Sequence, residues 1–264
     1  MNVYNNHGGN KIDPIGNLGF ERLAAEGLGN PNVDFYYGGH PNPKIFEQTD
    51  RKKVFFTTEE QSWSIDSTDT CIEVVDKILT ICPPSITGRS KRESCFFPFD
   101  ENFIPKEFNK QFDCIYTGAA DGPHVEDILS VISKFRYCFA SFVPRQHVTH
   151  FNVSYIDKLD LISRSKIYPL HNLTGTGTPQ SKTRMHEAAI GKALILCKRD
   201  EWNLIEEWYE EGKHFLYYKD KEELDKLIKL ILINYEKYIP IVEAAYNQAI
   251  NNYTTRHFIQ KYLS

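Results

Sequence analysis

Short apolar runs alternate along this chain with segments whose apolar positions recur every three or four residues. The apolar runs predict β-strands, and the helical spacing predicts α-helices between them. Because strands separated by helices pair in parallel, the pattern indicates an α/β protein with parallel sheets. The predicted strands cover residues 1–4, 33–37, 54–57, 78–82, 114–117, 137–143, 166–170, 193–197 and 214–218. The predicted helices cover residues 14–28, 123–135, 153–163, 182–190, 201–211, 220–240 and 241–262.

The segment 182–197 combines one of these helices with the strand that follows it. Its apolar residues keep helical spacing up to Gly191, and a short buried strand comes next. The helix begins with two cations, Lys182 and Arg184, and carries the carboxylate of Glu187 one turn later. Cations near a helix start suit a phosphate group, and a nearby carboxylate suits the diol of a ribose. The segment therefore predicts a site for a sugar nucleotide.

The same segment resembles a known signature. The order R-x-x-E-A, which starts here at Arg184 and is followed by Gly191 and an apolar run, is similar to that of GT-B glycosyltransferases. Gly191 comes one residue earlier than in that signature. The chain looks closest to the CgeB-like glycosyltransferases and to the C-terminal domain of group 1 glycosyltransferases. The resemblance covers residues 95–264 well and residues 1–95 only by their pattern.

The resemblance implies two Rossmann-like domains with parallel sheets. Residues 1–98 would form a small N-terminal domain on the acceptor side, and residues 112–250 would bind the nucleotide sugar. The aromatic and proline-rich residues 95–111 would link the two domains. Residues 251–264 would form a C-terminal helix that crosses back to the first domain.

The resemblance also implies roles for individual residues. Glu187 would bind the ribose hydroxyls of the donor, while Arg184 and Lys182 would neutralise its pyrophosphate. Gly118 lies in a small-residue loop after a predicted strand, where a ligand can approach the backbone closely. Asn172 lies in the loop before the 182–197 segment and is assigned to the same donor site.

A catalytic base would come from the first domain, because it must deprotonate an acceptor hydroxyl across the cleft. His7 and Asp13 follow the first predicted strand, and Glu59 and Glu60 follow the third. Ligands of open α/β sheets gather at the carboxyl ends of the strands, so these residues are the candidates for that base.

Two motifs of related enzymes are absent. Many retaining glycosyltransferases carry a second glutamate eight residues before the first, where this chain has Pro179. The choice between retention and inversion therefore stays open. The dinucleotide fingerprint G-x-G-x-x-G would need glycine at Gln180, which excludes a nicotinamide cofactor.

The sequence also lacks the usual metal motifs. The three histidines near the expected cleft, His124, His171 and His186, match no zinc spacing, and no D-x-D motif occurs. We therefore expect metal-independent chemistry that needs no cofactor.

Composition narrows the partners and the location. A net charge of −4 gives no basic footprint for nucleic acid, and no apolar run approaches the roughly 20 residues that span a bilayer. The six cysteines are scattered without a C-x-x-C pair, which favours reduced thiols in a cytoplasmic protein.

We expect a glycosyltransferase that moves a sugar from a nucleoside-diphosphate sugar, with UDP or GDP, to a hydroxyl of a glycan or glycoconjugate. Two alternatives remain open. A sugar-nucleotide epimerase would process the donor without an acceptor, and a non-catalytic module would bind a nucleotide or glycan only. The short first domain and Pro179 favour the second alternative.

Overall fold

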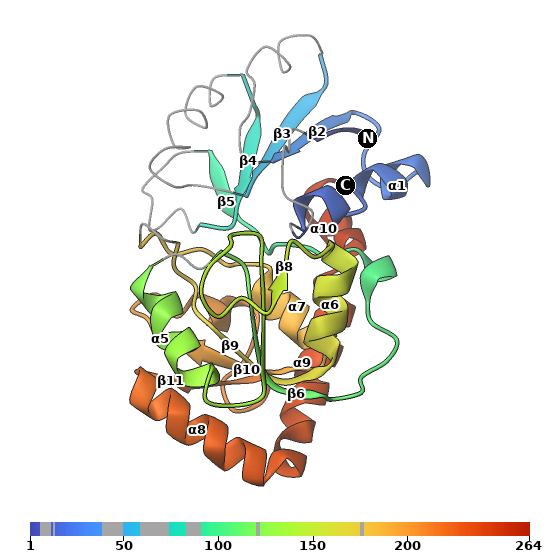
Figure 1. Cartoon of the computed structure of the whole chain (residues 1–264). Helices are drawn as coiled ribbons and strands as arrows, with labels where there is room; N and C mark the ends of the chain where they lie inside the picture. The colour runs from blue at the N-terminus through green and yellow to red at the C-terminus, as the bar shows by residue number, and fades with distance from the viewer. Residues whose placement is uncertain are drawn as a thin grey trace.

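The computed structural model describes residues 1–5, 12, 14–38, 50–58, 74–82, 91–119, 122–174 and 177–264. Within these residues the strands form one sheet of five and one of six, and every pairing of named strands is parallel. The predicted α/β fold with two parallel sheets is therefore confirmed. Figure 1 shows the two sheets one above the other, with the C-terminus close to the first helix.

The first sheet is built from the N-terminal part of the chain, and its strands lie side by side in chain order. They are β1 (Asn2–Asn5), β2 (Val33–Gly38), β3 (Lys52–Thr57), β4 (Lys77–Thr80) and β5 (Arg92–Ser94). All six residues of β2 are buried, as expected for a central parallel strand covered on both faces. The sequence pattern missed β5, whose three residues are polar and only partly buried.

The predicted helix 14–28 is divided in two. A 3₁₀ turn, η1 (Ile15–Asn17), is followed by α1 (Phe20–Ala25). Gly19 separates them with a φ of 74°, in the left-handed region that favours glycine. A Cβ at Gly19 would lie 2.2 Å from Asp100 Oδ2. The absence of a side chain at Gly19 therefore also lets Asp100, from a distant part of the chain, lie close to the backbone here.

The second sheet has the strand order β11-β10-β9-β6-β7-β8. Its strands are β6 (Phe112–Thr117), β7 (Tyr137–Ser141), β8 (His150–Phe151), β9 (Ser165–Leu170), β10 (Leu194–Lys198) and β11 (Phe215–Tyr218). Numbered from β6, this is the doubly wound order 3-2-1-4-5-6, which reverses direction between β6 and β9. Ligands of such sheets bind at the carboxyl ends of the strands beside that reversal. The two-residue edge strand β8 was not predicted.

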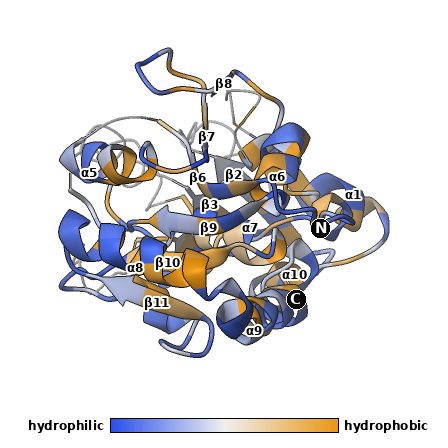
Figure 2. Ribbon diagram, turned by 60° about the horizontal axis from the view of Figure 1, so that its bottom comes forward, coloured by the Kyte–Doolittle hydropathy of each residue, from blue (hydrophilic) through white to orange (hydrophobic). Residues whose placement is uncertain are grey.

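Helices cover both faces of the second sheet. The apolar side chains of α5 (Pro123–Ile132) and α8 (Lys221–Ile233) pack together against one face. The helices α6 (Tyr155–Ser163), α7 (Arg184–Ile190) and α9 (Ile239–Asn252) pack against the other. Figure 2 shows α5 and α8 on one side of the strands and α7 and α9 on the other. The sheet is therefore buried on both faces.

The predicted helix 201–211 is wrong, because only a 3₁₀ turn, η3 (Leu204–Glu207), forms there. The backbone N–H groups of Trp202 and Asn203 donate to Asp200 Oδ1, and Asn203 has a left-handed φ of 48°. This side-chain turn competes with a helix start. Another 3₁₀ turn, η4 (Tyr235–Tyr238), separates α8 from α9.

The predicted helix 241–262 is also divided, into α9 and α10 (Thr255–Tyr262). Thr254 caps α10, because its side chain accepts from the N–H of His257. The ring of Phe258 in α10 lies 5.4 Å from that of Phe20 and 5.1 Å from that of Phe56. The C-terminal helix thus packs on the first sheet, while α9 packs on the second.

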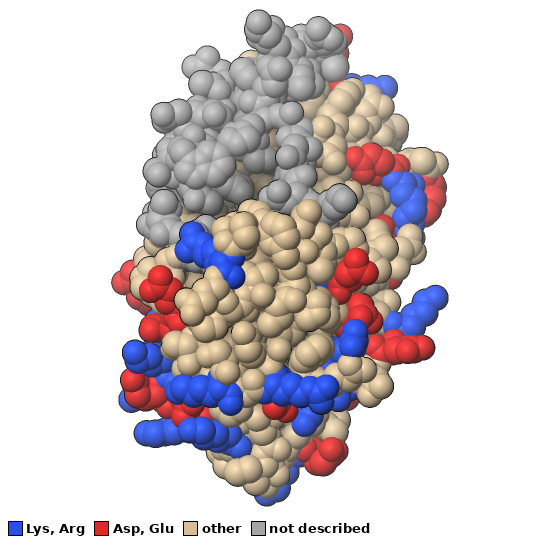
Figure 3. Space-filling model, in the orientation of Figure 1, with Lys and Arg blue, Asp and Glu red and all other residues tan. Residues whose placement is uncertain are grey.

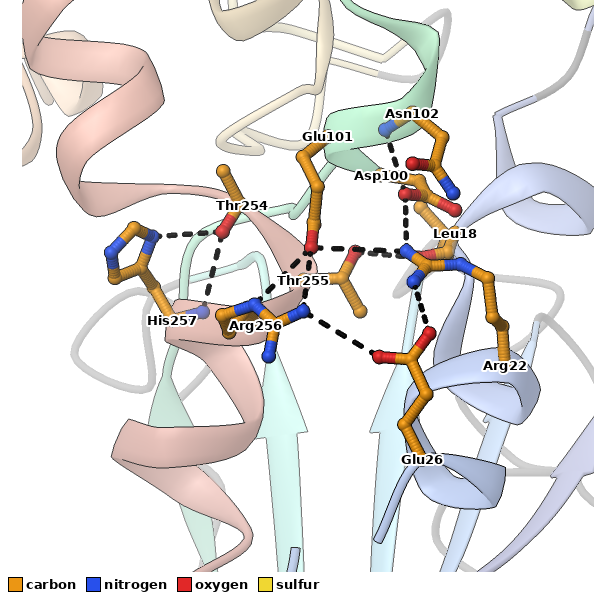
Figure 4. Close-up of polar contacts among 10 residues, drawn as sticks. All are labelled: Leu18, Arg22, Glu26, Asp100, Glu101, Asn102, Thr254, Thr255, Arg256 and His257. Atoms are coloured by element: carbon orange, nitrogen blue, oxygen red, sulfur yellow. Dashed lines mark hydrogen bonds and ion pairs between the residues drawn. The ribbon is translucent and has the colours of Figure 1, made fainter. Parts of the chain in front are cut away.

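Polar contacts fasten α10 to α1 and to η2 (Glu101–Phe103), a 3₁₀ turn in the segment between the sheets. Arg22 donates to Glu26 at 2.8 Å and to Asp100 at 2.7 Å, and Arg256 lies 3.2 Å from Glu101. The hydroxyl of Thr255 donates to the carbonyl of Leu18 at 2.5 Å. Figure 4 shows these groups converging from three elements. We call this cluster (Leu18, Arg22, Glu26, Asp100, Glu101, Thr255, Arg256) the α1–α10 junction.

The surface carries charges of both signs. On the face shown in Figure 3, lysine and arginine side chains of the described residues alternate with aspartate and glutamate. In the described part of the chain, every helix is too short or too polar to cross a lipid bilayer.

Candidate functional site

A cavity of about 350 Å³ opens between the two sheets, within the size range of small-molecule sites. It lies at the carboxyl ends of strands from both sheets. Thr58 follows β3, Ile81 follows β4, Gly118 follows β6 and His171 follows β9. The cavity therefore lies at the reversal point of the second sheet, with the first sheet as its opposite wall. Its described lining comprises Ile12, Pro14, Thr58, Ile81, Phe97, Thr117, Gly118, Ala119, Val125, Phe142, Lys158, His171, Leu173, Thr174, Gln180, Lys182, Thr183, Arg184 and Glu187.

Glu187 lies on the cavity wall in a buried ion pair. Its carboxylate is fully buried, and Oε1 accepts from Lys158 Nζ at 2.7 Å. Its other oxygen, Oε2, has no hydrogen-bond partner among the described residues. A buried charged acceptor without a partner costs more free energy than a neutral one, so this oxygen favours a ligand that brings a donor.

Arg184 lies on the same wall, at the first residue of α7. Its Nη1 donates to Tyr116 Oη at 2.6 Å, and its guanidinium lies 5.2 Å from the centre of that ring. Gly118 has a φ of 117°, and a Cβ there would lie 2.9 Å from Arg184 Nη2. Glycine at this position therefore leaves room for the guanidinium beside the backbone of the β6 loop.

The cavity region is rich in cations. Lys182 Nζ donates to the carbonyl of Leu173, and Lys198 Nζ lies 3.1 Å from His124 Nδ1. His171 lines the cavity between them, and its Nδ1 accepts from the N–H of Leu173 at 3.3 Å. Burial lowers the pKa of His171 well below 6.5, and the charges of Lys182 and Arg184 lower it further. Neutral His171 among fixed cations indicates a positive potential that an anion would neutralise.

Four buried polar atoms of lining residues have no partner among the described residues. They are Thr58 Oγ1, Gln180 Nε2, Thr183 Oγ1 and Glu187 Oε2. Thr183 precedes α7, yet its hydroxyl makes no capping hydrogen bond to that helix. Buried polar groups are normally paired, so these four atoms leave hydrogen-bonding capacity at the cavity wall for a ligand or an ordered water.

The predicted donor-site residues fall in different places. Glu187, Arg184, Lys182 and Gly118 line one cavity, as they would have to for the roles that the resemblance implies. Asn172 is 1% exposed and its Nδ2 donates to Cys197 Sγ at 3.6 Å, so its amide contacts the sheet instead. Asn172 is also not among the residues that line the cavity.

His186 does not lie near the cavity. It is fully buried, accepts from or donates to Tyr209 Oη at 2.8 Å, and packs 4.7 Å from the ring of Tyr253. Burial lowers its pKa to about 3. The expected grouping of His186 with the other two histidines is therefore wrong, because its side chain points from α7 into an aromatic cluster.

The candidate bases His7, Asp13 and Glu59 lie outside the residues that the structure describes. Within the described ranges, no three His, Cys, Asp or Glu side chains are grouped to hold a metal ion. The five cysteines described there are buried and free.

Lys158 is a site residue that the sequence reasoning missed. The buried face of α6 includes Tyr155, Leu159 and Ile162, and Lys158 lies on that same face. A lysine among core positions of a helix is the signal that could have identified it, since lysine is almost never fully buried without a partner. Thr58 and Gln180 gave no such signal, because a single polar residue after a strand or in a loop is ordinary.

The profile of a family described as glycosyl transferase-like matches residues 123–264, more than half of the chain. No curated protein is significantly similar to the chain in sequence.

Several solved structures are similar to the whole architecture. TarM of S. aureus has a TM-score of 0.61 at 12% identity, over 92% of this chain and 56% of TarM. HepE of Anabaena, solved with UDP and glucose, has a TM-score of 0.61 at 10% identity, over 87% of this chain and 76% of HepE. Sucrose-phosphate synthase of Thermosynechococcus elongatus has a TM-score of 0.61 at 6% identity, over 87% of this chain and 71% of the synthase. The chain thus spans little more than half the length of TarM, and these likenesses show the GT-B fold.

Proposed function

We propose that this protein transfers a sugar from a nucleoside-diphosphate sugar to an acceptor hydroxyl, from the premise that the chain belongs to the glycosyl transferase-like family. The observation that carries the proposal is the composition of the cavity wall. Arg184 and Lys182 supply positive charge, and four buried polar atoms nearby have no partner. A nucleoside-diphosphate sugar has two charged phosphates and many hydroxyl groups, so it complements both features.

The cations would act on the leaving group. When the bond between sugar and diphosphate breaks, negative charge grows on the diphosphate. Arg184 and Lys182 are held in place by Tyr116 Oη and the Leu173 carbonyl, so they meet that charge without reorganising. Gly118 allows Arg184 to lie against the β6 loop. Glu187 would accept from the ribose hydroxyls through its unpaired Oε2.

UDP is the first nucleotide to test, because HepE, which shares this fold, was solved with UDP. GDP is the second. Asn172 is not part of the proposed donor site, because its amide contacts Cys197. We propose that the transfer needs no metal ion, with the cations of the cavity in its place.

The first sheet would supply the acceptor side, with the chain divided into domains at 1–98 and 112–250. Residues next in the chain to two of the candidate bases support a base on the side of the first sheet. Ile12 and Pro14, which flank Asp13, line the cavity, and so does Thr58, which precedes Glu59. We propose Asp13, His7 and Glu59 as the candidates for that base.

The test is thermal melting and turnover with a panel of UDP- and GDP-sugars. A nucleotide at about 100 times its dissociation constant adds about 2.7 kcal/mol of stability, which a melting curve resolves. We expect one nucleotide family to raise the melting temperature and its sugar to be released or transferred. Binding without turnover, with or without acceptors, would instead support the non-catalytic alternative to which Pro179 points. No shift with either family would refute the donor site.

A further inference from the structure

The Lys158–Glu187 ion pair connects two helices at the cavity wall. Glu187 lies in α7 and Lys158 lies in α6, 29 residues earlier in the chain. The side chains are 0% and 5% exposed, so the pair is shielded from water. Only Glu187 Oε1 takes part in the contact, and Oε2 remains unpaired beside the cavity.

We propose that Lys158 is a positioning residue that orients Glu187, so that the site distinguishes ribose from 2′-deoxyribose in the donor nucleotide. This inference rests on the proposed function, since it assumes that a nucleotide occupies the cavity. It assigns to Lys158 a role that the resemblance to glycosyltransferases does not supply.

Both partners are held by rigid surroundings. The start of α6 carries a complete capping box between Ser154 and Asp157. The ammonium of Lys158 lies 4.6 Å from the centre of the Tyr155 ring, one helical turn earlier. On α7, the N–H of Glu187 donates to the carbonyl of Thr183 at 2.9 Å. The ammonium is therefore a fixed point against which the carboxylate is oriented.

The pairing decides what the carboxylate can do. The ammonium of Lys158 occupies Oε1 and fixes the orientation of the carboxylate, so that Oε2 is left as the acceptor for a ligand. The vicinal hydroxyls of a ribose are donors that fit such an acceptor, and loss of the 2′-hydroxyl removes one of them. Charge-assisted hydrogen bonds are about twice as strong as neutral ones, so this contact discriminates well.

The experiment measures the affinities for UDP and for 2′-deoxyuridine diphosphate by calorimetry in the full-length protein. If GDP is the nucleotide bound, GDP and its 2′-deoxy analogue replace them. We expect the wild type to prefer the ribose form by roughly tenfold or more, the effect of one charge-assisted hydrogen bond. In Lys158→Met that preference should fall to about twofold or less, while Lys158→Arg should keep part of it.

Lys192→Met is the matched control. Lys192 Nζ also donates to a glutamate, Glu243, with both contacts at 2.8 Å, and it does not line the cavity. Its removal should leave the ribose preference at the wild-type value. In a Glu187→Gln background, Lys158→Met should change the preference no further, because the two residues act as one unit.

The possible results separate the inference from the proposed function. If Lys158→Met binds both nucleotides more weakly by the same factor, Lys158 is only structural and the inference is wrong. If the wild type binds neither UDP nor GDP, the proposed function fails and the inference fails with it. Should Lys158→Met not fold, Lys158→Gln and Lys158→Arg give the same ratio measurement, and an unchanged ratio in both would overturn the inference.

Discussion

At the α1–α10 junction, acids and bases alternate, whereas at the cavity the cations gather on one side. Arg22 lies between Glu26 and Asp100, and Arg256 reaches both Glu26 and Glu101. Around the cavity, Arg184 and Lys182 are held by a phenol and a carbonyl, which are neutral. The junction thus matches its arginines with carboxylates, whereas the described cavity lining holds three cations (Lys158, Lys182 and Arg184) and one carboxylate, Glu187.

The difference follows from what each region must stabilise. Charges at the junction stabilise the contact of α10 with α1, so opposite charges lie within the protein. The described cavity lining holds more cations than carboxylates, so an anion that enters adds a counter-charge there. We therefore expect junction changes to alter stability and cavity changes to alter ligand binding and turnover.

The largest effect is expected for Arg184→Met. Removal of a fixed positive group that faces a developing negative charge typically lowers turnover by about 10²–10³, or about 2.7–4 kcal/mol. We expect a smaller change in the free energy of unfolding, because the hydrogen bond of Arg184 goes to a neutral phenol, Tyr116 Oη. Steady-state kinetics and urea unfolding measure the two quantities. Arg199→Met is the control, since Arg199 pairs with Glu211 on the surface at 2.9 Å, and its turnover should match the wild type.

Arg22→Met tests the other side of the comparison. It leaves Asp100, which is 4% exposed, without its guanidinium partner. We expect the free energy of unfolding to fall by about 1–2 kcal/mol, because one hydrogen bond to a buried charged group is lost. Nucleotide affinity should stay within twofold of the wild type. A large loss of affinity in a folded variant would show that the junction also governs the cavity.

Gly118→Ala should affect both quantities. Its φ of 117° strains any residue with a Cβ, and that atom would lie 2.9 Å from Arg184 Nη2. We expect a loss of about 1–3 kcal/mol in stability from backbone strain, and weaker nucleotide binding because Arg184 must shift. Gly212→Ala is the matched control, with a φ of 77° and nothing within 4 Å of its Cβ. It should lose stability without losing affinity.

The smallest effect is a pH dependence that comes from His186. Burial lowers its pKa to about 3, while an unfolded histidine titrates near 6.5. Between these values only the unfolded state takes up the proton, so stability is complete above about pH 6.5 and falls as the pH is lowered. His186→Gln should reduce the slope of unfolding free energy against pH by up to about 1.4 kcal/mol per unit. An unchanged slope between pH 4 and 6 would contradict the buried neutral state.

Much of the architecture could be predicted from the sequence, because it depends on local periodicity. Apolar runs separated by helical segments specify parallel sheets, and the two sheets confirm this. Arg184 and Glu187 are one helical turn apart, so their placement on one wall needed only a helix. The helix predictions that were wrong lie where a local group competes with the helix. The side chain of Asp200 forms a turn in place of the predicted helix 201–211, and Gly19 divides the predicted helix 14–28.

By itself, the sequence determined the succession of strands and helices, because the periodicity of apolar residues is a local property. It also determined which charges lie at the start of α7, because residues close in the chain are necessarily close in space. Only the tertiary structure decided which distant groups meet. Lys158 reaches Glu187 because α6 and α7 pack on the same face of the second sheet. Thr58 and Gln180 line the same cavity, where the carboxyl ends of strands from both sheets converge. Asn172 contacts Cys197 because side chains next to a strand alternate between its faces, and periodicity alone did not say which face holds the ligand.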